Sequence, residues 1–234
     1  MTSELNDDLV RTWVTGWART HGFDVHHDGA VHSALRSDST DQWEYIVYSP
    51  AETDLRKVSS AVAKGPNRLL TVIVEPEKDS FAEPDEYGLR LISDEEKLMV
   101  VDMGFQDVED PITPEGYSTE REDADGWTLF TVRQGDHLAA RGRLAVVDNY
   151  AILDRIYTNP DFRRQGLGTF VTRALTAIAL EQDVEEGLLV ATGDGQELYE
   201  FLGWTLLGDV HIYGGPKASE TESTHSQFDE IDSE

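Results

Sequence analysis

The alternation of apolar and polar positions along the chain predicts a mixed α/β protein. Apolar residues recur at helical spacing in four segments, and runs rich in aromatic and β-branched residues are typical of strands. Helices are expected at about 6–20, 52–63, 166–182 and 195–202. Strands are expected at 43–48, 69–74, 97–103, 127–133, 139–147, 150–158, 188–191 and 205–213. The three strands between 127 and 158 are separated by short turns and predict an antiparallel meander.

Turn-forming residues mark one main division of the chain. Two prolines and a glycine lie within the seven residues 110–116, and this cluster is the best boundary in the sequence. We therefore expect an N-terminal α/β domain at 1–111 without a recognisable motif and a second domain at 112–216. The remaining residues, 217–234, are polar and acidic and are expected to form a disordered tail.

Composition narrows the class of protein. The chain has 234 residues, no cysteine, and 46 acidic against 19 basic residues, for a formal net charge of -27. Such a charge disfavours nucleic-acid and anionic-membrane binding, and the lack of cysteine excludes disulfides and thiolate metal sites. No apolar run approaches the about 20 residues that span a bilayer, so we expect a cytoplasmic protein. The acidity, spread along the whole chain, is similar to that of proteins adapted to molar salt.

The segment from 156 to 168 carries the most informative pattern. It runs from a strand through a turn into a helix, with Arg163 and Arg164 before the helix and Gly166 and Gly168 at its start. Free backbone N–H groups and the helix dipole favour an anion such as a pyrophosphate at such a place. A third glycine for a dinucleotide fingerprint is missing at Val171, and no P-loop sequence is present. The other interpretation is a tight glycine turn with surface arginines.

This segment resembles the acetyl-CoA signature of the GCN5-related N-acetyltransferase (GNAT) superfamily. That signature is Arg or Gln, two residues, Gly, one residue, then Gly or Ala, and residues 163–168 match it after the turn at 158–160. A second family element, Leu-Tyr-x-x-Leu-Gly-Phe, is matched by residues 198–204. The resemblance covers about 150–205. It implies a mixed, mainly antiparallel sheet flanked by helices, preceded by a smaller N-terminal domain that could be a degenerate GNAT-like half.

The resemblance also implies an activity. An amine acceptor, either a small molecule or a protein N-terminus, would attack the thioester of acetyl-CoA directly, with no metal, in a monomer or homodimer. The expected cofactor-binding residues are Ile156, Tyr157, Thr158, Arg163, Arg164, Gln165, Gly166, Leu167, Gly168 and Thr169. Tyr199 matches the tyrosine that protonates the departing thiolate in many members.

At the position of the general base the chain departs from the family pattern. Many members carry a glutamate where this chain has Ile152, and an asparagine where it has Thr192. Asp154 lies on the same strand face as Ile152 by the period-two rule and is the candidate base. The alternatives are a solvated carboxylate at Asp154 and a core aromatic at Tyr199. A non-catalytic acyl-CoA sensor on the same fold is therefore the second hypothesis, and an interaction protein is the third.

Four histidines lie close together in the sequence, at His21, His26, His27 and His32. They surround an expected turn and lack an i, i+4 pair with a nearby carboxylate at metal-site spacing. We therefore expect no metal site.

Overall fold

A computed structural model describes residues 3–36, 42–76, 87–106, 109 and 111–215 of the chain. Its helices are α1 (Asp7–His21), α2 (Glu52–Val62), α3 (Leu167–Leu180) and α4 (Gly193–Phe201). Its strands are β1 (Asp24–Asp28), β2 (Val31–Leu35), β3 (Trp43–Tyr48), β4 (Leu69–Val74), β5 (Arg90–Asp102), β6 (Ser118–Ala124), β7 (Trp127–Gln134), β8 (His137–Val147), β9 (Tyr150–Thr158), β10 (Glu186–Ala191) and β11 (Thr205–Gly214). The expected disordered tail at 217–234 lies outside the described residues.

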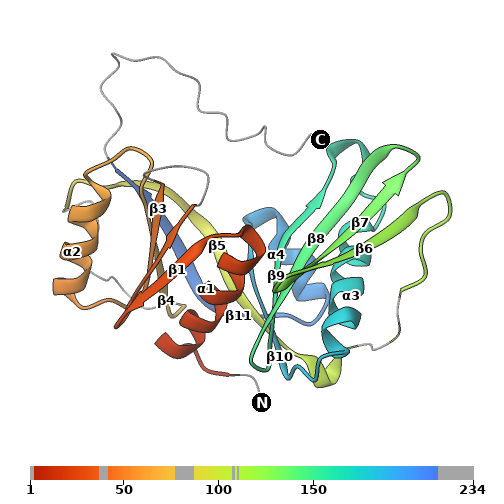
Figure 1. The fold of residues 1–234 in the computed structure, drawn as a ribbon, viewed down its shortest axis with the longest axis horizontal. Helices are drawn as coiled ribbons and strands as arrows, with labels where there is room; N and C mark the ends of the chain where they lie inside the picture. Colours follow the sequence, from red (N-terminus) through yellow and green to blue (C-terminus); the bar gives the residue numbers. More distant parts are fainter. Residues whose placement is uncertain (1–2, 37–41, 77–86, 107–108, 110, 216–234) are drawn as a thin grey trace, which may run out of the picture.

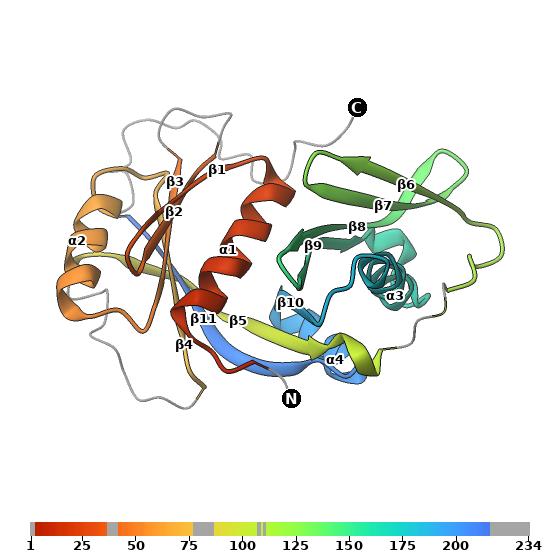
Figure 2. The same ribbon diagram turned by 60° about the horizontal axis from the view of Figure 1, so that its bottom comes forward.

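The strands join in one sheet, and its mainly antiparallel pairing with flanking helices confirms the expected mixed α/β fold class. The order is β1-β2-β3-β4-β11-β5-β10-β9-β8-β7-β6. The pairings β3–β4 and β9–β10 are parallel, and the other described pairings are antiparallel. Helices pack on both faces of this sheet, as Figures 1 and 2 show. The meander β7-β8-β9 and all four expected helices are present close to their expected bounds.

Three strands were not expected from the sequence. Strand β1 reads Asp-Val-His-His-Asp and β6 reads Ser-Thr-Glu-Arg-Glu-Asp-Ala, and neither contains the apolar alternation that marks a half-buried strand. Both lie at the edges of the sheet, and every residue of β6 is exposed. Strand β2 has only five residues and pairs β1 with β3. Neither β1 nor β6 contains a buried residue. A strand without a buried face needs no apolar alternation, so the sequence of these two strands carries no strand signal.

The two ends of the sheet repeat the same strand order. In the first half, α2 connects the parallel strands β3 and β4, and in the second half α3 connects the parallel strands β9 and β10. The strand that follows each unit is exchanged: β5 follows β4 but pairs with β10, and β11 follows β10 but pairs with β4. At the centre, β5 and β11 pair with each other. The two halves therefore share a strand order, and the sheet continues across the division expected near residue 112.

Helix α1 lies between the two halves and packs on both (Figures 1 and 2). Asn6 caps its start by accepting a hydrogen bond from the Leu9 backbone N–H, and Gly22 ends it in the left-handed region with φ 70°. Its buried face joins the first and second halves in one core. This core contains Leu9, Val10, Trp13, Val14, Ile46, Ile73, Leu98, Val100, Val147, Ile152, Leu188 and Val210. Helix α1 therefore fixes the relative position of the two halves.

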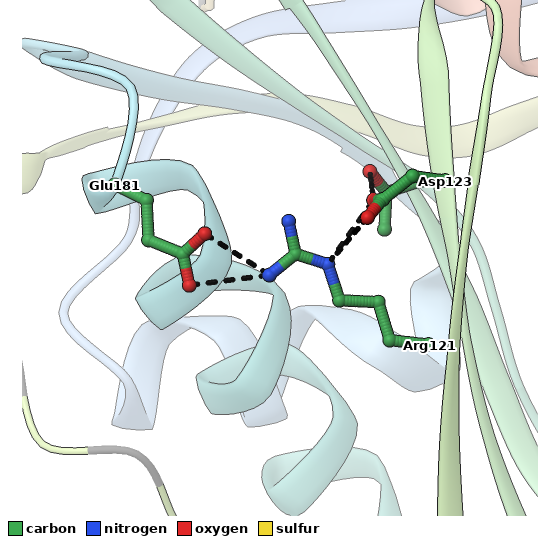
Figure 3. Close-up of polar contacts among 4 residues, drawn as sticks. Arg121, Asp123 and Glu181 are labelled. Carbon is green, nitrogen blue, oxygen red and sulfur yellow. Dashed lines mark hydrogen bonds and ion pairs between the residues drawn. The ribbon is translucent and has the colours of Figure 1, made fainter.

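The opposite face of the second half is covered by α3, and one ion-pair network ties the exposed edge strand β6 to that helix. Arg121 donates from Nη1 to the carboxylate of Glu181 at 3.0 Å and from Nε to Asp123 at 3.0 Å (Figure 3). Thr128 on β7 also donates to Asp123, at 2.7 Å. All three charged side chains are substantially exposed. Such exposed pairs contribute little to stability, so we assign the network a role in orienting the edge strand.

One glycine sets how closely α1 approaches the sheet. A Cβ atom on Gly16 would lie 2.5 Å from Ile152 Cγ1 and 2.8 Å from Ile152 Cβ. Alanine favours a helix interior over glycine by about 1 kcal/mol, but overpacking a core costs about 1–3 kcal/mol. We expect Gly16→Ala to lower the free energy of unfolding by about 1–2 kcal/mol in chemical denaturation. The cost should shrink in an Ile152→Ala background, and purely additive effects would contradict the contact.

Candidate functional site

The two parallel strands β9 and β10 diverge and open a wedge in the sheet. Their pairing runs from Tyr150 opposite Glu186 to Ile152 opposite Leu188 and then ends. Strand β10 continues to pair with β5 on its other side as far as Ala191. The last part of β9, residues 153–158, therefore has no partner on the β10 side among the described residues.

A β-bulge in β9 accompanies this divergence. Arg141 pairs with Tyr157 and Arg143 with Asp154, so two residues of β9, Arg155 and Ile156, face Gly142 alone. Arg155 has φ 51°, in the left-handed region. A bulge of this kind bends its strand and increases the local twist, which turns β9 away from β10.

The N-terminus of α3 lies at the open end of the wedge. Gly166 is its N-cap with φ 78°, no side chain caps the helix, and no acidic residue lies in its first turn. The first backbone N–H groups of the helix therefore remain available to an anion at its positive end. A Cβ on Gly168 would lie 3.2 Å from Leu198 Cδ2, so this glycine lets α4 approach α3 closely.

A cleft of about 860 Å³ connects the wedge to this helix terminus. Its volume lies within the about 300–1,000 Å³ typical of small-molecule sites. Eight of the ten expected cofactor-binding residues line it: Ile156, Thr158, Arg163, Arg164, Gly166, Leu167, Gly168 and Thr169. The other two, Tyr157 and Gln165, do not line the cleft. The Tyr157 ring lies 5.9 Å from the Arg141 guanidinium carbon, and Gln165 accepts a hydrogen bond from the Tyr117 hydroxyl at 2.7 Å.

Asp154 lies in the cleft at the inner end of the wedge and contacts α1. Its Oδ2 accepts hydrogen bonds from Thr20 Oγ1 and from His21 Nε2, both at 2.7 Å. Burial raises the pKa of this carboxyl, but the hydrogen bond and charge of His21, the hydrogen bond of Thr20 and the backbone N–H of Arg155 outweigh burial. The net result is a pKa below the usual range. Asp154 is therefore ionised near neutral pH.

Tyr199 lines the same cleft from α4. Its ring packs against Trp204 in an edge-on arrangement at 6.1 Å, and only 8% of its surface is exposed. Burial, followed by the negative charge of Asp154, raises the pKa of the phenol to about 12. The hydroxyl therefore keeps its hydrogen over the whole ordinary pH range and acts as a donor in the cleft.

The first half of the chain contributes a half-buried acid, Glu44, to the neighbourhood of Asp154. Glu44 on β3 accepts a hydrogen bond from Thr71 Oγ1 on β4 at 2.9 Å. Burial raises the pKa of the Glu44 carboxyl, and the negative charge of Asp154 raises it further. The Thr71 hydrogen bond and the positive charges of Arg36 and His21 lower it, but the net shift is upward. No motif in the sequence connects Glu44 or His21 with Asp154, because only the folding of the chain brings these distant positions together.

The four clustered histidines do not converge on one point. His21 contacts Asp154, His26 lies against Trp43 at 6.4 Å, and the Nδ1 atoms of His27 and His32 are 2.9 Å apart. Burial lowers the pKa of both His27 and His32. Within the described ranges, no group of three or more His, Cys, Asp or Glu side chains is arranged to hold a metal ion.

Comparison with known proteins identifies relatives of this architecture. Residues 95–204 match the model of the acetyltransferase (GNAT) family. No curated protein matches the sequence. In the described part of the chain, no helix combines the length and apolarity needed to cross a bilayer.

Several solved structures share the fold over nearly the whole chain. A GCN5-related N-acetyltransferase from Kribbella flavida has a TM-score of 0.67 at 16% identity, covering 93% of this chain and 98% of that one. A putative GNAT acetyltransferase from Novosphingobium aromaticivorans has a TM-score of 0.58 at 16% identity, covering 89% and 97%. A tandem GNAT protein from the clavulanic acid biosynthesis pathway has a TM-score of 0.57 at 14% identity, covering 91% and 89%.

Proposed function

Because residues 95–204 match the acetyltransferase (GNAT) family and the whole chain shares the fold of GNAT structures, we propose an acetyl-CoA-dependent N-acetyltransferase with an amine acceptor. The observation that carries the proposal is the cleft that joins the uncapped N-terminus of α3 to the wedge beside Asp154 and Tyr199. The cleft offers a site for an anion at the start of α3 and ionisable side chains, Asp154 and Tyr199, at its other end. Acetyl transfer needs the first to hold the phosphates of CoA and the second to move protons during the reaction.

Acetyl-CoA would bind with its pyrophosphate at the start of α3. The backbone N–H groups around Gly166 and Gly168 and the side chains of Arg163 and Arg164 form a positive site there, in a chain whose net charge is -27. The unpaired edge of β9 at Ile156 and Thr158 can hydrogen-bond the amide groups of the pantetheine arm as an added strand would. The thioester would then lie between Asp154 and Tyr199.

In the reaction the neutral amine nitrogen attacks the thioester carbonyl carbon, the C–N bond forms and the C–S bond breaks. The Tyr199 hydroxyl donates its hydrogen to the departing sulfur, which needs a proton to leave as a thiol. The Asp154 carboxylate assists removal of the proton from the amine. Tyr199 would thus act as the general acid and Asp154 would assist the general-base step.

Helix α1 explains why the glutamate position of many family members is apolar here. Ile152 is fully buried and packs on Gly16 of α1, so a carboxylate at this place would be buried without a partner. Asp154, two residues later on the same face, lies past the end of this contact and reaches Thr20 and His21. The first half of the chain would thus form the wall on the acceptor side of the site.

Titration calorimetry with acetyl-CoA and CoA, followed by release of CoA thiol with a panel of primary amines, tests the proposal. Micromolar binding with thiol release that depends on an amine would support the transferase. Binding without release would favour the non-catalytic acyl-CoA sensor, to which Ile152 and Thr192 point. No binding would leave an interaction protein and contradict both.

We also propose that the protein is a cytoplasmic enzyme adapted to high salt. The support is the excess of 46 acidic over 19 basic residues, because molar salt screens repulsion among such charges. The titrations should therefore be run in molar KCl and in dilute buffer. An unfolding temperature that does not rise with KCl would contradict the salt adaptation.

Glu44 is expected to lower the stability of the folded protein near neutral pH. Because burial raises its pKa, the ionised form destabilises the folded protein above the pH at which an unfolded glutamate titrates. We expect Glu44→Gln to raise the unfolding temperature near neutral pH, measured by thermal denaturation. Glu122→Gln, on the exposed strand β6, is the matched control and should leave the unfolding temperature unchanged.

A further inference from the structure

One arginine of the cleft is not accounted for by cofactor binding. Arg155 lines the cleft from the bulge of β9, and its side chain is exposed. Its guanidinium has no hydrogen-bond or ion-pair partner among the residues that the structure describes. Arg163 and Arg164, by contrast, lie in the turn before α3, where the pyrophosphate would bind. The cleft therefore holds a further positive charge that is available to a ligand, in a chain whose net charge is -27.

The position of Arg155 along β9 is nearer to Asp154 than to the start of α3. It follows Asp154 directly, and the Cα atoms of neighbouring residues are about 3.8 Å apart. Thr158, the last residue of β9, accepts a hydrogen bond on its carbonyl from Arg163 Nε at 3.4 Å. A strand rises about 3.3 Å per residue, so Arg155 lies up to about 10 Å along the strand from that contact. We therefore assign Arg155 to the inner end of the cleft, beside Asp154.

The backbone of Arg155 also indicates a role for its side chain. Its φ is 51°, a conformation that residues with a Cβ rarely adopt. The residue belongs to the bulge opposite Gly142, and its backbone N–H donates to the Asp154 carboxylate. Glycine would adopt this backbone conformation without strain. Strained residues are concentrated at functional sites, and an arginine at this position is consistent with a function for the guanidinium.

We propose that Arg155 binds the carboxylate of the acceptor, and that the acceptor is a free amino acid. This inference rests on the proposed transferase function and names the substrate class of the same cleft. A guanidinium binds a carboxylate through two parallel hydrogen bonds. Asp154 would contact the ammonium group, because Thr20 and His21 both donate to its Oδ2 and a carboxylate has about four lone-pair sites. The opposite charges of two neighbouring residues thus match the two charges that an amino acid carries close together.

The same pair of charges disfavours the other classes of amine acceptor. A polyamine has no carboxylate and would bring a second positive charge towards Arg155. A protein N-terminus has its first carboxyl group bound in a peptide bond. Either acceptor would leave the guanidinium without a partner, and this difference would give the site its specificity. Acetylation turns the ammonium into a neutral amide, so the product loses its attraction to Asp154, which favours product release.

The test uses each of the twenty standard amino acids and its own carboxamide as acceptors. Amidation removes the carboxylate and keeps the amine and the side chain. In the wild type, at least one amino acid should exceed its carboxamide in kcat/KM, measured as release of CoA thiol. Arg155→Gln should lower kcat/KM for that amino acid by about 10- to 100-fold, the effect of losing charge-assisted hydrogen bonds, and change it for the carboxamide by less than about twofold. Arg173→Gln, exposed on α3 and outside the cleft, is the matched control and should behave as wild type.

Two further variants separate the side chain from the backbone of Arg155. Glycine adopts a φ of 51° without strain, so Arg155→Gly should unfold at a temperature no lower than that of the wild type and still lose the preference for the amino acid. Arg155→Lys should keep part of the preference, because the charge remains but the planar pair of donors is lost. A preference that survives in Arg155→Gly would contradict the proposal.

Titration calorimetry distinguishes this role from a contact with the cofactor. The affinity of Arg155→Gln for acetyl-CoA should stay within about twofold of wild type, whereas a loss of about tenfold or more would assign Arg155 to the phosphates of CoA and overturn the proposal. Equal losses with amino acid and carboxamide, or no amino acid that exceeds its carboxamide, would also overturn it. If the wild type transferred to no amine, the transferase would be contradicted. Binding of an amino acid to the CoA complex that depends on Arg155 would then still support the carboxylate site, and its absence would reject that site as well.

Discussion

Gly166→Glu is expected to abolish acetyl-CoA binding, with an affinity loss of at least about 100-fold in titration calorimetry. Gly166 has φ 78°, where a residue with a Cβ is strained by about 1–2 kcal/mol. The new carboxylate would also lie at the N-terminus of α3, beside the proposed pyrophosphate position. A negative charge there repels the phosphates and competes for the same N–H groups, each of which is worth about 1.5–3 kcal/mol with a charged partner.

Gly135→Glu separates these causes. Gly135 lies in the β7–β8 turn with φ 58°, and at both glycines the position that a Cβ would occupy has no neighbouring atom within 4 Å. Its replacement introduces the same kind of strain and the same charge at a residue that does not line the cleft. It should lower stability by a similar amount and leave acetyl-CoA affinity unchanged. Equal affinity losses in both variants would mean that α3 does not bind the cofactor.

Tyr199→Phe is expected to lower kcat by about 10²–10³-fold while acetyl-CoA affinity stays within about twofold of wild type. The change removes the hydroxyl that donates to the leaving sulfur but keeps the ring that packs on Trp204. Steady-state release of CoA thiol, together with calorimetry, measures both quantities. Tyr87→Phe, in the apolar cluster under α2, is the matched control and should leave kcat unchanged.

The pH dependence gives a second check on Tyr199. Its pKa is raised to about 12, so the phenol stays protonated as the pH rises through the range in which the protein can be assayed. The wild-type kcat should therefore show no alkaline decline from this group. An alkaline limb that disappears in Tyr199→Phe would indicate an ordinary phenol and contradict the burial argument.

The sequence predicted the parts of the fold whose signals are local. The helix periodicity around Trp13 and the glycines at 166 and 168 are such signals, and α1 and the α3 terminus lie where they indicate. Asp154 was selected by strand periodicity, and the structure places it and Tyr199 on one cleft. The polar edge strands β1 and β6 carry no apolar alternation and were missed for that reason.

The rest of the site depends on contacts between distant segments. His21 reaches Asp154 only because α1 crosses from the first half onto β9, and Glu44 joins them because β3 and β4 face the same helix. Neither position has a motif of its own. The exchange of β5 and β11 is equally invisible in a sequence, because each strand has the same pattern whichever neighbour it joins.

That exchange bears on how the chain can be divided in the laboratory and in evolution. A fragment beginning near residue 112 would lose β5, the strand that covers the free edge of β10, and a fragment ending there would lose β11 beside β4. Each piece would expose a long row of unpaired backbone groups, which favours aggregation. Gene fission between the halves would therefore succeed only if both pieces were made together and assembled as one unit.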